Sequence, residues 1–283
     1  MAESYQPAAI STARSISRRE VFTWVVSILA AHYFLMFRGA EGTSFFDALM
    51  QSLVSKSVFH YLGWYAVFQL LADSEASRPA TKGDLALGLA VLPVPFLSGE
   101  GYVWISMTVV GLYLWATSRA DRKIQAAATV VLALSLNGLW GRLLFDLLAP
   151  PLLQADTALV GALLAVTRSG FAWNGTIISS DVHSIIVLSG CSSFHNISLG
   201  LLCWVSLTKL ARPEWVKGDV WVALAVCAAV LLLNTLRIYL MAFGPEFYAY
   251  LHAGFGAQLF SWTTSAAVVA ISLWGVLRAP QSR

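Results

Sequence analysis

Charged side chains are scarce in this chain, where they make up 12% of the 283 residues, while 58% of the residues are hydrophobic. Soluble domains carry about 25% charged residues, so the composition excludes an ordinary soluble globular protein. The net charge is only +3, and the cations flank apolar runs without forming a stripe, so nothing indicates nucleic-acid binding. Apolar runs of about 20 residues, long enough to cross a bilayer as helices, recur along the chain. The sequence therefore predicts an all-α polytopic membrane protein.

Several catalytic patterns are also missing. The three cysteines (Cys191, Cys203 and Cys227) show no pair at a metal-ligand or redox spacing, so neither a disulfide framework nor a metal site is expected. There is no His-Glu-x-x-His for zinc and no Gly-x-Ser-x-Gly for a serine nucleophile. No pair of aspartates lies on facing spans. These absences argue against zinc, serine and aspartyl intramembrane proteases.

The positive charges predict a topology. We expect about eight spans, over residues 20–37, 52–72, 84–98, 102–117, 125–148, 190–208, 219–242 and 256–277. If the N-terminus is cytoplasmic, most Lys and Arg residues fall in cytoplasmic segments, as the positive-inside rule requires. The sequence thus predicts one integral membrane domain over 20–278, with cytoplasmic tails at 1–19 and 279–283 and an uncleaved first span.

This topology keeps residues 149–189 on the outer side as one piece. The apolar stretch 156–168 is too short for a span and favours an interfacial or re-entrant helix. The following residues, 171–190, contain two β-branched runs separated by Ser-Ser-Asp, which predict a small hairpin or extended pair on the outer surface.

Polar residues from three distant segments meet at the outer face in this topology. Cys191 begins the sixth span, Asn234 and Arg237 lie in the outer half of the seventh, and His252 lies in the loop before the eighth. A helix N-terminus and nearby cations favour the reactive thiolate. Histidine can carry the proton, and arginine can stabilise an oxyanion. Each residue also has a structural interpretation, as a packing cysteine, a snorkelling arginine or an ordinary loop histidine.

The set resembles the exosortase/archaeosortase family of membrane-embedded cysteine transpeptidases. The resemblance rests on Cys191-Ser192-Ser193, on Asn234-Thr235-Leu236-Arg237-Ile238, and on His252 with Gly256, and it covers roughly residues 130–277. One departure is Ser193, which stands where the family usually has glycine, followed by Phe194-His195-Asn196 in place of basic or apolar residues.

The resemblance implies a sorting enzyme of the inner membrane with its active site on the extracytoplasmic side. Its partners would be the bilayer and the C-terminal signals of secreted proteins, which consist of a short motif, a transmembrane helix and a basic tail, as in PEP-CTERM proteins. Cys191 would be the nucleophile, Arg237 the stabiliser of oxyanion and thiolate, and His252 the general acid and base. No metal or organic cofactor is implied, and an exopolysaccharide-linked role is typical of bacterial relatives. The motif, the acceptor, hydrolysis versus transpeptidation and the oligomeric state stay open.

Other residues near the outer face have open roles. His195 lies four residues after Cys191 and is a rival base to His252, and Asn234 and Ser192 could contact the substrate or support the nucleophile. Arg142 and Asp146 have the spacing of an i,i+4 ion pair and could alternatively contact the substrate. A transporter or channel with polar residues at its outer face is the alternative function.

Overall fold

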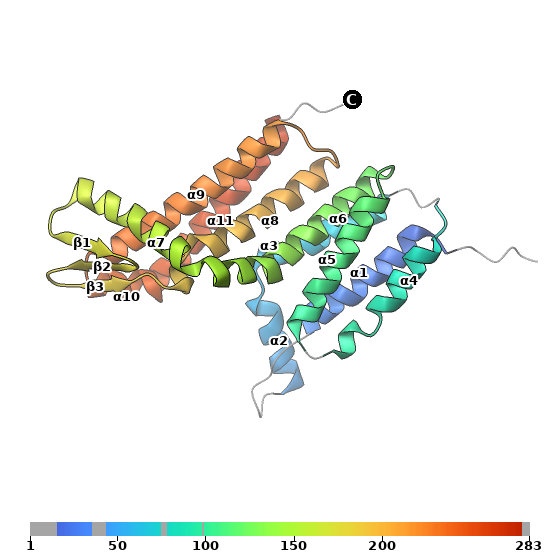
Figure 1. The fold of residues 1–283 in the computed structure, drawn as a ribbon, viewed down its shortest axis with the longest axis horizontal. Helices are drawn as coiled ribbons and strands as arrows, with labels where there is room; N and C mark the ends of the chain where they lie inside the picture. Colours follow the sequence, from blue (N-terminus) through green and yellow to red (C-terminus); the bar gives the residue numbers. More distant parts are fainter. Residues whose placement is uncertain (1–15, 36–43, 75–77, 98, 279–283) are drawn as a thin grey trace, which may run out of the picture.

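The computed structural model describes residues 16–35, 44–74, 78–97 and 99–278, so most of the expected tails at 1–19 and 279–283 lies outside the described residues. The chain is helical apart from one small sheet, which confirms the all-α prediction (Figure 1). The long elements are α1 (Arg18–Leu35), α2 (Phe45–Ser55), α3 (Val58–Ala72), α4 (Lys82–Val91), α5 (Glu100–Thr117), α6 (Arg122–Ser135), α7 (Gly141–Thr167), α8 (Ser193–Ala211), α9 (Gly218–Met241), α10 (Pro245–His252) and α11 (Phe255–Arg278). Three short turns are η1 (Val94–Phe96), the π-helix η2 (Leu136–Trp140) and η3 (Ser189–Cys191).

Within the described residues, three helical stretches are long and apolar enough to cross a membrane: Arg122–Thr167, α9 and α11. Two further apolar helices, Val58–Ala72 and Gly101–Thr117, are shorter. These lengths are compatible with a membrane protein. α4 has ten residues and is much shorter than the span expected over 84–98. It ends before Pro93 and Pro95, because proline disfavours the helical conformation of the residue that precedes it.

α6, η2 and α7 form one helical path of 46 residues, Arg122–Thr167. Residues 156–167 are helical, as expected, but they form the last part of α7 and not a helix of their own. The helix also continues past residue 148, where the fifth span was expected to end, and Pro150 and Pro151 lie inside α7. Proline removes helical hydrogen bonds and bends a helix without necessarily ending it. Figure 1 shows this path turning away from α6 toward the sheet.

The sheet is antiparallel, with the order β1 (Phe171–Asn174), β2 (Ile177–Ser180) and β3 (Ser184–Ile186). The β2–β3 pair confirms the hairpin expected in this segment. The additional strand β1 was missed, although Asn174-Gly175 is a strong hairpin signal. Gly175 has φ +58°, which favours glycine in the tight turn.

The central core lies where α3, α6 and α8 pack together. Val67, Leu134 and Leu202 of these helices are at most 1% exposed. Gly63 allows this close approach, because a Cβ there would lie 2.9 Å from Leu134 Cδ2. A second apolar cluster lies under the sheet, joins α7, α9 and α10 to it, and includes Cys191.

At one end of the bundle, hydrogen bonds join the starts of α1 and α6 to the ends of α3 and α5 and to the segment that leads into α4. They run from Arg18 to the carbonyls of Arg78 and Thr117, from Arg19 to that of Ala72, and from Lys123 to that of Asp73. Arg18 also forms an ion pair with Asp84, with 3.2 Å between Nε and Oδ1. The same Asp84 caps α4 by accepting hydrogen bonds from Thr81. Cationic segments that are far apart in sequence are therefore neighbours in the fold.

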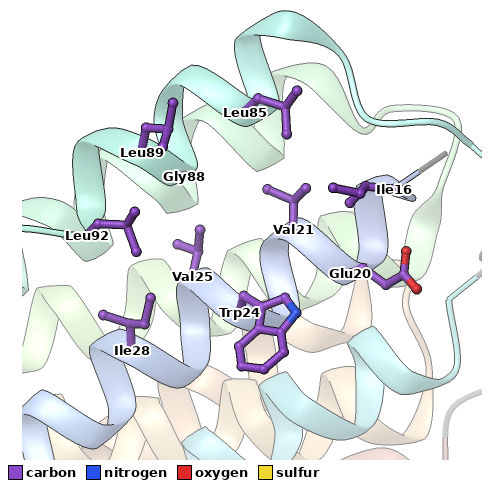
Figure 2. Close-up of a pocket in the computed structure, with 10 residues that line it drawn as sticks. All are labelled: Ile16, Glu20, Val21, Trp24, Val25, Ile28, Leu85, Gly88, Leu89 and Leu92. Carbon is purple, nitrogen blue, oxygen red and sulfur yellow. The ribbon is translucent and has the colours of Figure 1, made fainter. Parts of the chain in front are cut away.

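An apolar groove of about 430 Å³ lies between α1 and α4. Figure 2 shows Leu85 and Leu89 of α4 facing Val21 and Val25 of α1, with Glu20 at one end. Trp24 beside the groove is 72% exposed. The groove contains no cysteine or histidine, so it contributes no nucleophile or base to the chemistry considered below.

The ion pair at the cationic end predicts a stability effect. Asp84→Asn leaves the buried Arg18 guanidinium without its counter-charge, and breaking a buried pair typically costs about 3 kcal/mol. We expect a clearly lower thermal unfolding midpoint in detergent. Asp73→Asn is the matched control, because Asp73 is exposed and its replacement should change stability by less than about 0.5 kcal/mol. Equal midpoints for the two variants would contradict a stabilising role for the pair.

Candidate functional site

The candidate site is built around the turn that carries Cys191. The chain leaves β3 and forms η3, in which Cys191 is 5% exposed and belongs to the apolar cluster under the sheet. Ser192 then caps α8, since its Oγ accepts a hydrogen bond from the Phe194 N–H at 3.2 Å. Cys191 therefore lies immediately before the N-terminus of α8, as expected, but its thiol is buried and not on the surface.

Asp156 of α7 holds the start of α8. Its carboxylate accepts two hydrogen bonds from Ser193, from the backbone N–H at 3.1 Å and from Oγ at 2.6 Å. Asp156 is only 5% exposed. The hydrogen-bond partner of this buried acid is therefore Ser193, two residues after Cys191. Sequence reasoning missed this residue, although a lone acid in an apolar run is itself a signal, because burying an unpaired carboxylate is costly.

The Asn-x-x-Arg motif of α9 contacts the other two motifs. Asn234 is buried and donates a hydrogen bond from Nδ2 to the backbone carbonyl of Cys191 at 2.7 Å. Arg237, one turn later, donates from Nε to the carbonyl of Leu251 at 3.0 Å. Leu251 directly precedes His252 in α10. The cysteine turn, α9 and α10 are thus linked by two hydrogen bonds.

His252 is the last residue of α10, and its side chain is exposed. Its ring stacks on Tyr248 with 4.8 Å between the centroids. The Tyr248 ring also makes an edge contact with the ring of His183, with 5.8 Å between the centroids. His183 lies in the turn between β2 and β3. The His252 imidazole therefore lies at the surface beside the sheet. The backbone carbonyl of the preceding residue, Leu251, is the group that accepts the Arg237 hydrogen bond.

A cavity of about 230 Å³, which we call the Arg237 cavity, lies between α8, α9 and α11. Asn234 and Arg237 line it from α9, and Gly190 and Asn196 line it from the cysteine turn and α8. Ser261 and Thr264 add hydroxyl groups from α11. The cavity is therefore a polar space among apolar helices, which is typical of a binding site in a membrane bundle.

A second cavity of about 350 Å³, the Arg142 cavity, lies between α7 and the start of α8. Gly190 lines it, and its polar lining comprises Arg142 and Asp146 of α7 and, around the start of α8, Ser189, Ser192, His195, Asn196 and Ser198. Gly190 and Asn196 line both cavities. Cys191 itself is not among the lining residues of either cavity. The buried nucleophile candidate thus belongs to a turn that borders both cavities.

A chain of hydrogen bonds fixes the first turns of α8 to the bundle. His60 Nε2 lies 2.8 Å from Asn137 Oδ1, and Asn137 Nδ2 donates to Ser198 Oγ at 2.7 Å. Ser198 Oγ donates to the carbonyl of His195 at 2.8 Å. Asn137 lies in the π-helix η2, a local irregularity that is frequent at functional sites. Sequence reasoning did not identify Asn137, because the π-helix that turns its side chain toward α8 has no sequence signature of its own.

Among the described residues, no group of three or more His, Cys, Asp or Glu side chains has the geometry to hold a metal ion. We found no significant match of the chain to a protein-family model, a curated protein or a solved structure. Functional arguments therefore depend on the geometry around Cys191.

If the Asp156–Ser193 contact holds the cysteine turn in place, loss of this contact should make the Cys191 thiol more accessible. In a Cys203→Ser, Cys227→Ser background, Cys191 is the only thiol, and its burial should make alkylation by N-ethylmaleimide slow. Asp156→Ala removes the acceptor of two buried hydrogen bonds, at a cost of roughly 1–3 kcal/mol, and should speed alkylation several-fold. Asp181→Ala is the control, because Asp181 is exposed in the β2–β3 turn. Equal alkylation rates in the two variants would exclude a role for Asp156 in holding the turn.

Proposed function

We propose that this chain is a membrane-embedded cysteine peptidase and transpeptidase of the exosortase/archaeosortase kind. It would cleave the C-terminal signal (motif, transmembrane helix and basic tail) of secreted proteins through a Cys191 thioester. The observation that carries the proposal is the 2.7 Å hydrogen bond from Asn234 to the Cys191 carbonyl, together with Arg237, which lines the same cavity as Asn234. This contact joins two short motifs that lie 43 residues apart, as one site requires.

The proposal includes eight crossings of the membrane, with both termini in the cytoplasm. α1, α3, α5, α6, α8, α9 and α11 would each cross, and α4 with η1 would complete the set. At 1.5 Å per residue, the 46-residue path of α6 to α7 is about 69 Å long, so its second half extends past a bilayer core of about 30 Å. The hydrogen-bonded cationic end favours a cytoplasmic location by the positive-inside rule. Cys191 lies at the opposite end of α8 from Lys209 and would face the extracytoplasmic side.

In the first step, the Cys191 sulfur attacks the scissile carbonyl carbon. The C–S bond forms, the C–N bond breaks, and the thiol proton passes through a histidine to the leaving amine. Arg237 suits the stabilisation of the oxyanion, because its Nε is held by Leu251 and its two terminal nitrogens have no hydrogen-bond acceptor among the described residues. His252 is the proposed acid and base of this step. It directly follows Leu251, whose backbone carbonyl accepts the hydrogen bond from Arg237, so the end of α10 that carries His252 is joined to Arg237.

Cys191 gives the first test of this function. A secreted reporter that ends in motif, helix and basic tail is co-expressed with the chain, and tail loss is followed by immunoblot. We expect Cys191→Ala and Cys191→Ser to abolish tail loss, because neither variant can form the thioester. Cys203→Ala, which changes a buried thiol within α8, is the matched control and should retain activity. Tail loss by Cys191→Ala would overturn the proposal, and transport activity that survives Cys191→Ser would favour a transporter.

Arg237 gives a second test. Arg237→Gln removes the positive charge beside the proposed oxyanion, and loss of one such stabilising group typically lowers kcat by about 10²–10³-fold. Arg168→Gln is the control, because Arg168 packs over the Phe243 ring outside the Arg237 cavity. Initial rates of tail release in detergent-solubilised membranes provide the measurement. Similar rates for the two variants would show that Arg237 only anchors α10.

A further inference from the structure

We propose that the Arg142 cavity is the acceptor site of the transfer reaction. It would receive a small primary amine that resolves the Cys191 thioester, with His195 as the base. This inference rests on the proposed function, and it assigns the two cavities to the two halves of the reaction. The Arg237 cavity would hold the acyl group and its oxyanion, and the Arg142 cavity would hold the incoming nucleophile.

The position of the two cavities supports this division. Gly190 and Asn196 line both of them, so both border the turn that would carry the acyl group. At Gly190 an added Cβ would meet no atom within 4 Å, so there is open space directly beside the nucleophile. A thioester on Cys191, once exposed by substrate binding, could therefore be approached from either cavity.

The two cavities differ in exposure. In the Arg237 cavity, Asn234 is buried and Arg237 is half-buried, and α11 contributes further lining residues within the bundle. In the Arg142 cavity, the side chains of Arg142, Asp146 and His195 are all exposed. An acceptor can therefore reach these side chains without entering the bundle. The enclosed cavity suits a peptide that emerges from the membrane with its helix.

The lining of the Arg142 cavity suits an amine. The Asp146 carboxylate can accept a hydrogen bond from the neutral amine, and the His195 imidazole can take the one proton that the attacking nitrogen must lose. The cavity volume of about 350 Å³ lies in the range of small-ligand sites. The rings of Phe145 and Phe194, 5.9 Å apart, supply an apolar surface for the rest of the acceptor. The Ser198–His195 hydrogen bond continues the chain from His60 and holds the backbone of the proposed base.

The proposed step is balanced. The nitrogen of the neutral amine attacks the thioester carbonyl carbon, a C–N bond forms, and the C–S bond breaks with its electron pair on Sγ of Cys191. The proton lost by the nitrogen goes to His195. The imidazolium then protonates the thiolate, which restores neutral His195 and the Cys191 thiol. No metal, oxidant or reductant takes part.

The test separates formation of the thioester from its resolution. The full-length chain in detergent is mixed with the tailed reporter in a single turnover, with glycinamide as the amine probe. Tail release reports thioester formation, and decay of the covalent enzyme–reporter adduct reports its resolution. We expect His195→Gln to leave the rate of tail release within about twofold of wild type and to slow adduct decay by about tenfold or more.

Two further variants sharpen the test. Asp146→Asn should raise the glycinamide concentration needed for half-maximal capping of the reporter, while Asp181→Asn, outside the cavity, should not. If tail release slows as much as adduct decay in His195→Gln, or if the adduct decays at the wild-type rate, the acceptor site is wrong. If wild-type tail release is absent or persists in Cys191→Ala, the proposed function itself fails, and the acceptor site with it.

Discussion

The hydrogen bond from Asn234 to the Cys191 carbonyl is the contact on which the site depends. An apolar bundle offers no water to the backbone groups of an irregular turn, and an unpaired buried carbonyl costs about 1–3 kcal/mol. The turn before α8 is such a place, because η3 interrupts regular structure inside an apolar cluster. Asn234 satisfies its carbonyl from one side, and Asp156 satisfies the Ser193 N–H from the other. Two helices distant in sequence are thereby fixed against the same turn.

This requirement also explains the course of α7. Asp156 reaches Ser193 only because the helix continues past Pro150 and Pro151 and passes beside the sheet. The π-helix before α7 places Asn137 against Ser198, so a single stretch of chain supports α8 through both contacts. The irregularities of the α6–α7 path, which include two prolines and a π-turn, are therefore the features that position the start of α8.

The sequence was informative where chemistry and periodicity coincide. The apolar runs predicted the helices, the β-branched runs predicted β2 and β3, and the predicted topology brought Asn234 of the seventh span close to Cys191. It was less informative where a contact depends on tertiary geometry. Nothing local in the sequence shows that α7 passes through Pro150, that Asn137 lies in a π-helix, or that the Cys191 thiol is buried while His252 is exposed. These features follow from how helices pack, which local sequence patterns do not encode.

The burial of the turn also bears on which residue can be the nucleophile. Three candidates follow one another, Cys191, Ser192 and Ser193, and all are at most 5% exposed. A buried hydroxyl needs a partner, and Ser192 and Ser193 use theirs to cap α8 and to bind Asp156. A thiol behaves as a small apolar group and can stay in the cluster with Ile238 and Leu251 without a hydrogen bond. Cysteine is therefore the one of these three side chains that the turn buries without engaging it in holding the helix, as the proposed nucleophile requires.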